Sequence, residues 1–235
     1  MPGADAPAYS HNDYLNPRPL TDALRAGVRG VEADVFLIDG RLRVGHDRNQ
    51  ASRAGTFEAV YLQPLAALAA RCGQLTESGA PFLLLLEVKE ASHPAYEALV
   101  AMLQGHEHWI ALDGVPRDRP VEVVMVGWTP AEDDARVMRQ RRIANRGDTL
   151  AGPGVRLLSM DYGKTMGRRW RTAAGRRKWV STLRAARRAN PHCLLRVHNV
   201  PVEARIYKEL LAAGVDLVGT RNLAATRGVL EGLRR

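Results

Sequence analysis

Two histidines near the start of the chain flank a pair of carboxylates. His11 lies in SHNDY and His46 in VGHD, while Glu32 and Asp34 lie between them in VEADVFLI. Strand side chains alternate between two faces, so Glu32 and Asp34, two positions apart, point the same way. Two buried like charges repel each other, and a divalent cation with oxygen ligands relieves that cost. The spacing therefore indicates a metal site or, in the plainer interpretation, the solvent-facing side of an edge strand.

A third carboxylate, Glu87, ends the apolar run PFLLLLEVK. Such a run is typical of a strand that is buried on both faces. Lys89 follows two positions later and should share the face of Glu87, which places a cation where a phosphate could meet it. The alternative is a salt-bridged strand end with no further role.

The elements that must position these residues alternate between apolar strand-like runs and helical patterns, which favours a parallel sheet of βαβ units. Seven strands are predicted, at Ala8–His11, Gly30–Leu37, Phe82–Val88, Val121–Val126, Val155–Met160, Cys193–Val197 and Leu217–Gly219. Helices are predicted around 20–26, 61–72, 94–104, 131–143, 178–189, 202–213 and 222–233. An eighth strand near Trp109–Leu112 would complete a TIM-type (β/α)8 barrel, either closed or distorted.

In such a barrel the chemistry belongs at the carboxyl ends of the strands. His11 ends the first predicted strand, Asp34 lies late in the second, and Glu87 lies at the end of the third. The short extended segment RLRVGHD, which ends near His46, could return beside the second strand. The fold thus predicts that the four side chains meet at one end of the barrel.

Length and composition favour one domain. The chain has 235 residues, of which 46% are hydrophobic and 25% charged, and we expect a flexible segment at 1–7 and one barrel domain at 8–235. Cys72 and Cys193 lie far apart without metal-ligand spacing, which favours buried thiols. No stretch of about 18 apolar residues is present, and the first residues lack the features of a leader, so a cytoplasmic protein and one exported after leader removal both stay open.

Six segments together carry a resemblance to a known family. HNDY, PLTDALRAG, VEADVFL, DGRLRVGHD, TFEAVYLQPL and LLLEVK resemble the phospholipase C-like phosphodiesterases. The nearest branch contains phosphatidylinositol-specific phospholipase C and glycerophosphodiester phosphodiesterase family proteins, including the yeast-type altered-inheritance-of-mitochondria proteins. The resemblance covers roughly 8–100, resumes weakly in LLRVHNVPVEARIYKELLAAGVDLVGTRNL, and is slight over about 101–190.

The resemblance implies a TIM-type barrel that binds one divalent cation. Glu32, Asp34 and Glu87 match the family's acidic metal ligands, and His11 and His46 match its paired catalytic histidines. One histidine would accept a proton from the attacking oxygen while the other protonates the leaving alcohol. All proposed ligands are oxygen atoms, which favours Mg²⁺ or Ca²⁺. Which histidine is the acid, and whether the nucleophile is water or a substrate hydroxyl, stay open.

One departure from the family concerns the residue after the first histidine. Glycerophosphodiesterases usually carry arginine there, whereas this chain has Asn12. Either the phosphate contact comes from elsewhere, with Arg18, Lys89 and Arg196 as candidates, or the substrate differs from that of the glycerophosphodiesterases. We expect Asn12, Lys89, Arg196 and His198 to contact the substrate.

Positive charge is concentrated in one part of the sequence. The chain carries a net charge of +9, yet 136–188 alone carries +14, which leaves −5 for the rest. Such a field attracts phosphodiesters, anionic membranes or nucleic acid. The loop 161–177, with Trp170 and the nearby Trp179, is a candidate lid or lipid-facing patch. The plainer interpretation is an arginine-rich composition on solvated helix faces.

The sequence thus predicts a metal-dependent phosphodiesterase that cleaves a glycerophosphodiester or phospholipid-like substrate with two histidines. A small phosphodiester or a lipid headgroup is the expected partner, with an anionic membrane surface as an option; no specific protein partner is implied, and nucleic acid is disfavoured. One alternative is a non-catalytic phosphate- or nucleic-acid-binding barrel that uses the Arg-rich region 136–188. Another is a phospholipase that acts on membranes, which differs from the first in substrate alone.

Overall fold

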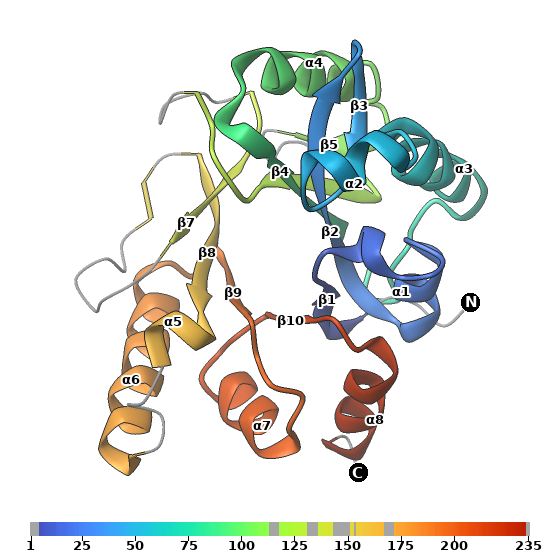
Figure 1. The fold of residues 1–235 in the computed structure, drawn as a ribbon. Coiled ribbons are helices and arrows are strands. Elements are labelled where there is room, and N and C mark those ends of the chain that lie inside the picture. Colours follow the sequence, from blue (N-terminus) through green and yellow to red (C-terminus); the bar gives the residue numbers. More distant parts are fainter. Residues whose placement is uncertain are drawn as a thin grey trace.

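The computed structural model describes residues 5–112, 118–130, 136–142, 151–152, 154–166 and 172–233. Eight strands in this part of the chain form a closed ring, and helices lie outside it (Figure 1). The ring strands are β1 (Ala6–Ser10), β2 (Val28–Ile38), β4 (Phe82–Val88), β6 (Val121–Met125), β7 (Arg139–Arg142), β8 (Val155–Asp161), β9 (Leu194–His198) and β10 (Leu217–Thr220). All neighbouring pairs of the ring are parallel, and β1 closes it by pairing with both β2 and β10. The predicted TIM-type barrel is confirmed, in its closed form.

The helices return the chain between parallel strands, as βαβ connections require. The longer ones are α1 (Thr21–Ala26), α3 (Gln63–Cys72), α4 (His93–Gln104), α6 (Ala173–Ala189), α7 (Ala204–Ala212) and α8 (Leu223–Leu233). Shorter elements are the 3₁₀ turns Asp13–Leu15 and Lys89–Ala91, α2 (Arg48–Arg53), a π turn at Glu58–Leu62 and α5 (Tyr162–Met166). No helix among the described residues combines the length and apolarity that crossing a membrane would require.

Two small strands lie beside the ring. Strand β3 (Arg41–Val44) runs antiparallel to β2 and returns the chain toward His46, as the sequence predicts. Strand β5 (Ile110–Ala111) pairs with β6 alone. The segment near Trp109–Leu112 is therefore not the eighth ring strand, and that prediction is wrong.

The missing ring strand is β7, in a segment predicted to be helical at 131–143. Its sequence, RQRR, carries no apolar or β-branched signal, so pairing with β6 and β8 determines its conformation. The remainder of the predicted helix, at 131–135 and 143, lies outside the described residues.

The first strand begins slightly earlier than the sequence suggests. Strand β1 starts at Ala6, two residues before the predicted domain boundary, and Asp5 accepts hydrogen bonds from the backbone and hydroxyl of Ser78 at 2.9 and 2.7 Å. Residues 1–4 lie outside the described part.

Strand alternation divides the core into two layers. Leu83 and Leu85 face the barrel interior with Tyr9 and Val124, while Leu84 and Leu86 belong to the layer between strands and helices. Across from Tyr9 in the register lies Gly219, where an added Cβ would come within 2.5 Å of the tyrosine hydroxyl. The glycine thus leaves room for a phenol ring inside the barrel.

Candidate active site

A polar cavity opens at the carboxyl ends of the strands, where a barrel places its functional residues. Its volume is about 250 Å³. The lining residues come from almost every ring strand or the segment after it: His11, Asn12, Glu32, Asp34, His46, Glu87, Lys89, Val126, Gln140, Asp161, Lys164, Arg196, His198, Asn199 and Arg221.

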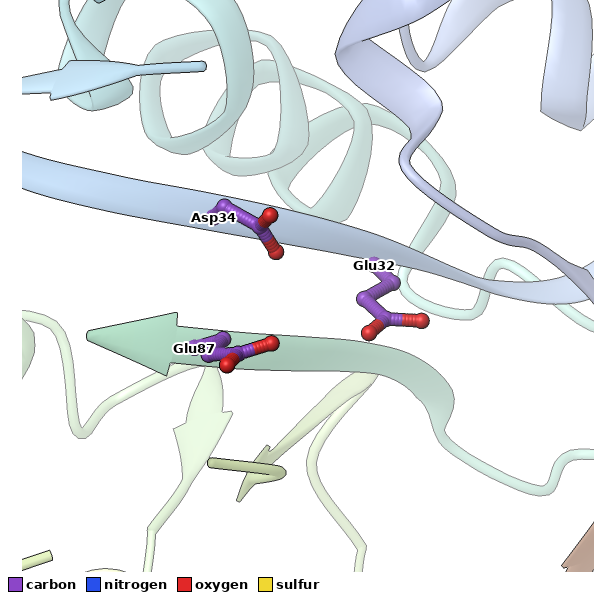
Figure 2. Close-up of side chains that lie close together, drawn as sticks. All are labelled: Glu32, Asp34 and Glu87. Atoms are coloured by element: carbon purple, nitrogen blue, oxygen red, sulfur yellow. The ribbon is translucent and has the colours of Figure 1, made fainter. Parts of the chain in front are cut away.

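Three carboxylates gather on adjacent strands β2 and β4. Asp34 pairs with Glu87 in the register, and Glu32 pairs with Leu85 one layer deeper in the barrel. Figure 2 shows Asp34 and Glu32 on one strand and Glu87 on its neighbour. One oxygen from each carboxylate lies within 4.8 Å of the others, with Glu32 and Asp34 buried and Glu87 half-buried. The strand alternation and register thus produce the predicted cluster.

The cluster fits a hard divalent cation. Asp34 Oδ1 is buried and has no hydrogen-bond partner among the described residues. Burial raises the pKa of the Asp34 carboxyl, since its charge is poorly solvated there. A buried, unpartnered carboxylate oxygen beside two further carboxylates is the donor set that Mg²⁺ or Ca²⁺ prefers.

Lys89 occupies the same face, as predicted. Its Nζ lies 3.4 Å from Asp34 Oδ2 and 3.6 Å from Glu87 Oε1. Partial burial disfavours the ammonium, yet these two carboxylates together raise the pKa of Lys89 above its usual value. The side chain therefore stays charged beside the cluster.

Arg196 holds Glu32 from inside the barrel. Its guanidinium donates to Glu32 Oε2 at 2.6 Å, to the Tyr9 hydroxyl at 2.6 Å and to Gln140 Oε1 at 3.1 Å. The side chain is almost fully buried and lies over the Tyr9 ring, 4.6 Å from its centroid. Arg196 lines the cavity, and three of its five N–H donors are engaged with these protein groups, which gives it a positioning role toward Glu32. Its contact with a substrate stays a prediction.

His11 lies directly after β1, and its Nε2 is 3.8 Å from Glu32 Oε2. Burial, and then the positive charge of Arg196, lower the pKa of His11 to about 3. The imidazole is therefore neutral near pH 7 and has a lone pair to accept a proton.

His46 lies on the other side of the cluster and is open to solvent. Its Nδ1 lies 3.4 Å from Asp34 Oδ2, 3.4 Å from the Tyr14 hydroxyl and 3.5 Å from Asn12 Nδ2. The Tyr14 hydroxyl also donates to Asp34 Oδ2 at 2.7 Å. Asn12 is buried, and its backbone is left-handed (φ 54°). Its side-chain contact with Nδ1 helps to position the His46 ring.

Strands β8 and β9 carry a third histidine–carboxylate pair. His198 Nε2 lies 3.4 Å from Asp161 Oδ2, and its Nδ1 lies 3.3 Å from the Ser159 hydroxyl. The His198 and His11 ring centroids are 6.1 Å apart, so His198 does face the cavity. Burial, followed by the charge of Arg196, lowers the pKa of His198 to about 4.

Asp161, the carboxylate beside His198, is held by several hydrogen-bond donors. Its carboxylate accepts hydrogen bonds from the Lys164 backbone at 2.9 Å and from Asn199 Nδ2 at 3.0 Å. Partial burial opposes ionisation, but these donors and His198 hold the pKa of Asp161 below its usual value. The backbone of Asn199, like that of Asn12, is left-handed, at φ 56°.

Sequence reasoning missed several residues that line the cavity or contact its lining residues. Tyr14 lies inside the quoted HNDY motif, which could have revealed it. Lys164 lies in the loop 161–177, the candidate lid, but carried no signal of its own. Arg221 carried none beyond its place after a predicted strand, and Gln140 fell in a segment predicted to be helical. Arg18, a candidate phosphate contact, instead pairs with Asp22 at 2.7 Å.

The arginine-rich region is partly internal. Arg156 donates to Glu122, and Arg187 donates to the carbonyl oxygens of Gly214 and Cys193. Trp179 is buried against Tyr162, at 5.7 Å between ring centroids, so its predicted role at an interface is wrong. Trp170 and the rest of 167–171 lie outside the described residues.

A model of the AIM6-like phosphodiesterase domain matches residues 4–80, which include four of the five predicted catalytic and metal residues. Among curated relatives, the altered inheritance of mitochondria protein 6 homolog of Arthroderma benhamiae is 28% identical over 149 residues, covering 53% of this chain and 48% of the relative. The altered inheritance of mitochondria protein 6 of Eremothecium gossypii is 29% identical over 155 residues, which cover 57% of this chain and 40% of the relative. The chain therefore spans about half or less of the length of these relatives.

Among solved structures, the glycerophosphodiester phosphodiesterase from Agrobacterium tumefaciens has a TM-score of 0.56 at 15% identity, covering 97% of this chain and all of the other. At this identity the likeness shows the fold alone. The domain that matches residues 4–80 is described as a phosphodiesterase domain, and the shared barrel agrees with the fold described above. Over the matched residues the chain is thus similar to this phosphodiesterase domain, in agreement with the resemblance that the sequence motifs carry.

Proposed function

We propose that the protein hydrolyses or transesterifies the phosphodiester bond of a glycerophosphodiester or phospholipid-like substrate, using one divalent cation and two histidines. The observation that carries the proposal is the carboxylate cluster, whose oxygens lie within 4.8 Å of one another, flanked by His11 and His46. Acidic clusters alone are common on proteins. In this one, two of the three carboxylates are buried, and each flanking imidazole lies within 4 Å of one of the carboxylates.

Glu32, Asp34 and Glu87 would hold Mg²⁺ or Ca²⁺. The bound cation would polarise the phosphoryl group and offset the charge that develops on it. Lys89 contributes a second positive charge next to the same oxygens, since its Nζ already lies between Asp34 and Glu87. Arg196 orients Glu32 through the hydrogen bond at 2.6 Å.

The two histidines would divide the proton transfers. One takes the proton of the attacking hydroxyl, from water or from the substrate itself, and the other gives a proton to the leaving alcohol. Asn12 and Tyr14 fix the ring of His46 through contacts at its Nδ1. Both histidines reach the cavity from the first 46 residues, the part of the chain that the matched domain covers.

The test is ³¹P NMR of the protein with soluble glycerophosphodiesters, lysophospholipids and phospholipid vesicles, first with Mg²⁺ or Ca²⁺ and then with EDTA. We expect a phosphomonoester or cyclic phosphate that appears only with metal. The His11→Ala and His46→Ala variants should each lose about 10²–10⁴-fold in rate, and Glu87→Gln should lose metal binding in calorimetry. His108→Ala, an exposed histidine away from the cavity, is the matched control.

Two results would contradict the proposal. One is turnover that persists in EDTA or in both histidine variants. The other is no turnover of any substrate by a folded, metal-loaded protein, which would favour a phosphate-binding barrel instead. Cleavage of vesicles alone would assign the phospholipid substrates.

A further inference from the structure

A basic groove lies on the outside of the barrel, away from the active-site cavity. Its two sides are helices α6 and α7, which follow the adjacent strands β8 and β9; Figure 1 shows both helices outside the ring. The groove has a volume of about 640 Å³. None of the residues that line it also lines the active-site cavity, so it is a separate surface feature.

The groove carries a large excess of positive charge. Its lining includes one carboxylate, Glu209, which pairs with Arg205 at 3.2 Å. Helix α6 contains six cations and no acid in the sequence AAGRRKWVSTLRAARRA. Four of these cations also line the groove: Arg176, Arg177, Arg184 and Arg188. The lining therefore has four more positive than negative charges.

Three of the four α6 arginines have no structural contact that would account for them. Arg177, Arg184 and Arg188 are exposed, and none forms an ion pair or a side-chain hydrogen bond with another described residue. Arg187 of the same helix is different, because it donates two hydrogen bonds to the carbonyl oxygen of Gly214 and so joins α6 to the segment before β10. The groove arginines thus remain available to a ligand.

The charge pattern of α6 opposes helix formation. Arg184 and Arg188 are four positions apart, where like charges repel, and Arg176 lies in the first turn, near the positive end of the helix dipole. Helix α8, in contrast, pairs Arg227 with Glu231 four positions later, at 2.7 Å. A bound anion would relieve the repulsion in α6. This face of the helix is therefore better explained as a binding surface than as an ordinary solvated surface.

The shape of the groove and its apolar lining favour a peptide over other polyanions. At a rise of 1.5 Å per residue, Arg176 and Arg188 are about 18 Å apart along the axis of α6. Val180 lies between them, and Ala212 lines the groove from α7. An amphipathic helix can fill such a groove, whereas a flat bilayer would contact its edges alone. Among the described lining residues none is aromatic, so nucleobases would have no side chain to stack on.

We infer that the α6–α7 groove binds an acidic amphipathic helix of a partner protein. The carboxylates of this helix lie on both sides of an apolar stripe and pair with the arginines of α6 and with Arg205. The apolar stripe lies over Val180 and Ala212. This inference goes beyond the proposed function and does not depend on it, because the groove and the active-site cavity share no residue. Since the groove arginines of α6 are largely exposed, the affinity falls as salt rises.

The binding test uses fluorescence anisotropy of a labelled helical peptide, with Glu on both sides of a Leu stripe, titrated with the full chain. The peptide has about 20 residues and so spans about 30 Å. We expect the Arg184→Gln/Arg188→Gln variant to bind it about 3–10-fold more weakly than the wild type, the range for two exposed ion pairs. The control Arg25→Gln/Arg71→Gln removes the same charge from exposed positions on α1 and α3 and should bind like the wild type.

Circular dichroism verifies that both variants are folded, and a scrambled peptide of the same composition tests whether the pattern matters. Equal binding of the scrambled peptide, or equal weakening in the two variants, would overturn the inference in favour of general charge attraction. Phosphatidylserine vesicles or polyuridylate that bind through Arg184 and Arg188, while the patterned peptide does not, would assign the groove to a membrane or to nucleic acid. Self-association that the Arg184/Arg188 variant loses, measured by sedimentation, would assign it to a second copy of the chain. No binding of any probe would also overturn the inference.

Discussion

The two walls of the cavity handle charge in opposite ways. On β2, Glu32 and Asp34 are buried, and Glu32 is held inside the barrel by the 2.6 Å bond from Arg196. After β8 and β10, the cations Lys164 and Arg221 lie at the rim and face solvent. Buried charges need closely paired partners at fixed positions to offset their desolvation. Exposed charges attract ions over longer distances and do not need fixed side-chain positions. The first arrangement suits holding a cation and a reacting group, and the second suits attracting an anion.

Removing Arg196 is expected to give the largest effect, on the buried wall. Arg196→Met leaves Glu32 buried without its cation, which should lower the free energy of unfolding by about 3–5 kcal/mol in metal-free protein. Adding Glu32→Gln removes the buried carboxylate charge that Arg196→Met leaves unpaired. The double variant should therefore recover part of the lost free energy of unfolding. Urea unfolding measures both. A single variant within about 1 kcal/mol of the wild type would show that this wall does not depend on its ion pair.

Gly127 tests how tightly Glu87 is held on the same wall. An added Cβ at Gly127 would come within 2.5 Å of Glu87 Cγ, so Gly127→Ala must displace that side chain. We expect Mg²⁺ or Ca²⁺ affinity to fall by about 10–100-fold, the range for disturbing a ligand's support. Calorimetric titration with the metal is the measurement. Gly228→Ala, on α8 with nothing within 4 Å of the added carbon, is the control and should bind metal like the wild type.

His198 tests the opposite wall through pH. Its pKa is about 4 in the folded protein, below the usual value of about 6.5. The unfolded chain therefore binds the proton first as pH falls, and this contribution to stability is present above about pH 6.5 and lost toward pH 4. The wild type should lose about 1–2 kcal/mol more than His198→Asn between pH 7 and pH 5. Thermal unfolding at both pH values checks this, with the exposed His108→Asn as control; equal losses in all three proteins would contradict it.

The buried wall could be predicted from the sequence because its signals are local. The period of two in VEADV and the apolar run before Glu87 determine which side chains face the barrel, and the ring order brings the two strands together. Strand β4 was predicted at its observed bounds. The alternation of strand and helix patterns predicted the TIM-type barrel, but it left open whether the barrel closes.

The exposed wall could not be predicted in the same way. Strand β7 has only polar residues, and its conformation depends on β6 and β8. Lys164 and Arg221 are ordinary surface cations in sequence, and only ring closure brings them to one cavity. Trp179 looked amphipathic in sequence, but packing against Tyr162 buries it.

The bond between Arg196 and Glu32 spans 164 positions of the chain, and this distance has a consequence for biosynthesis. The carboxylates leave the ribosome early, within the first 87 residues, but the guanidinium that neutralises Glu32 leaves it only with β9. Contacts between such distant residues form late in folding, after the entropy of closing a long loop has been lost. On the nascent chain, Glu32 thus lacks its guanidinium partner until the barrel is nearly complete. A chain that stalls before residue 196 has the acidic strand β2 without the arginine that pairs with Glu32.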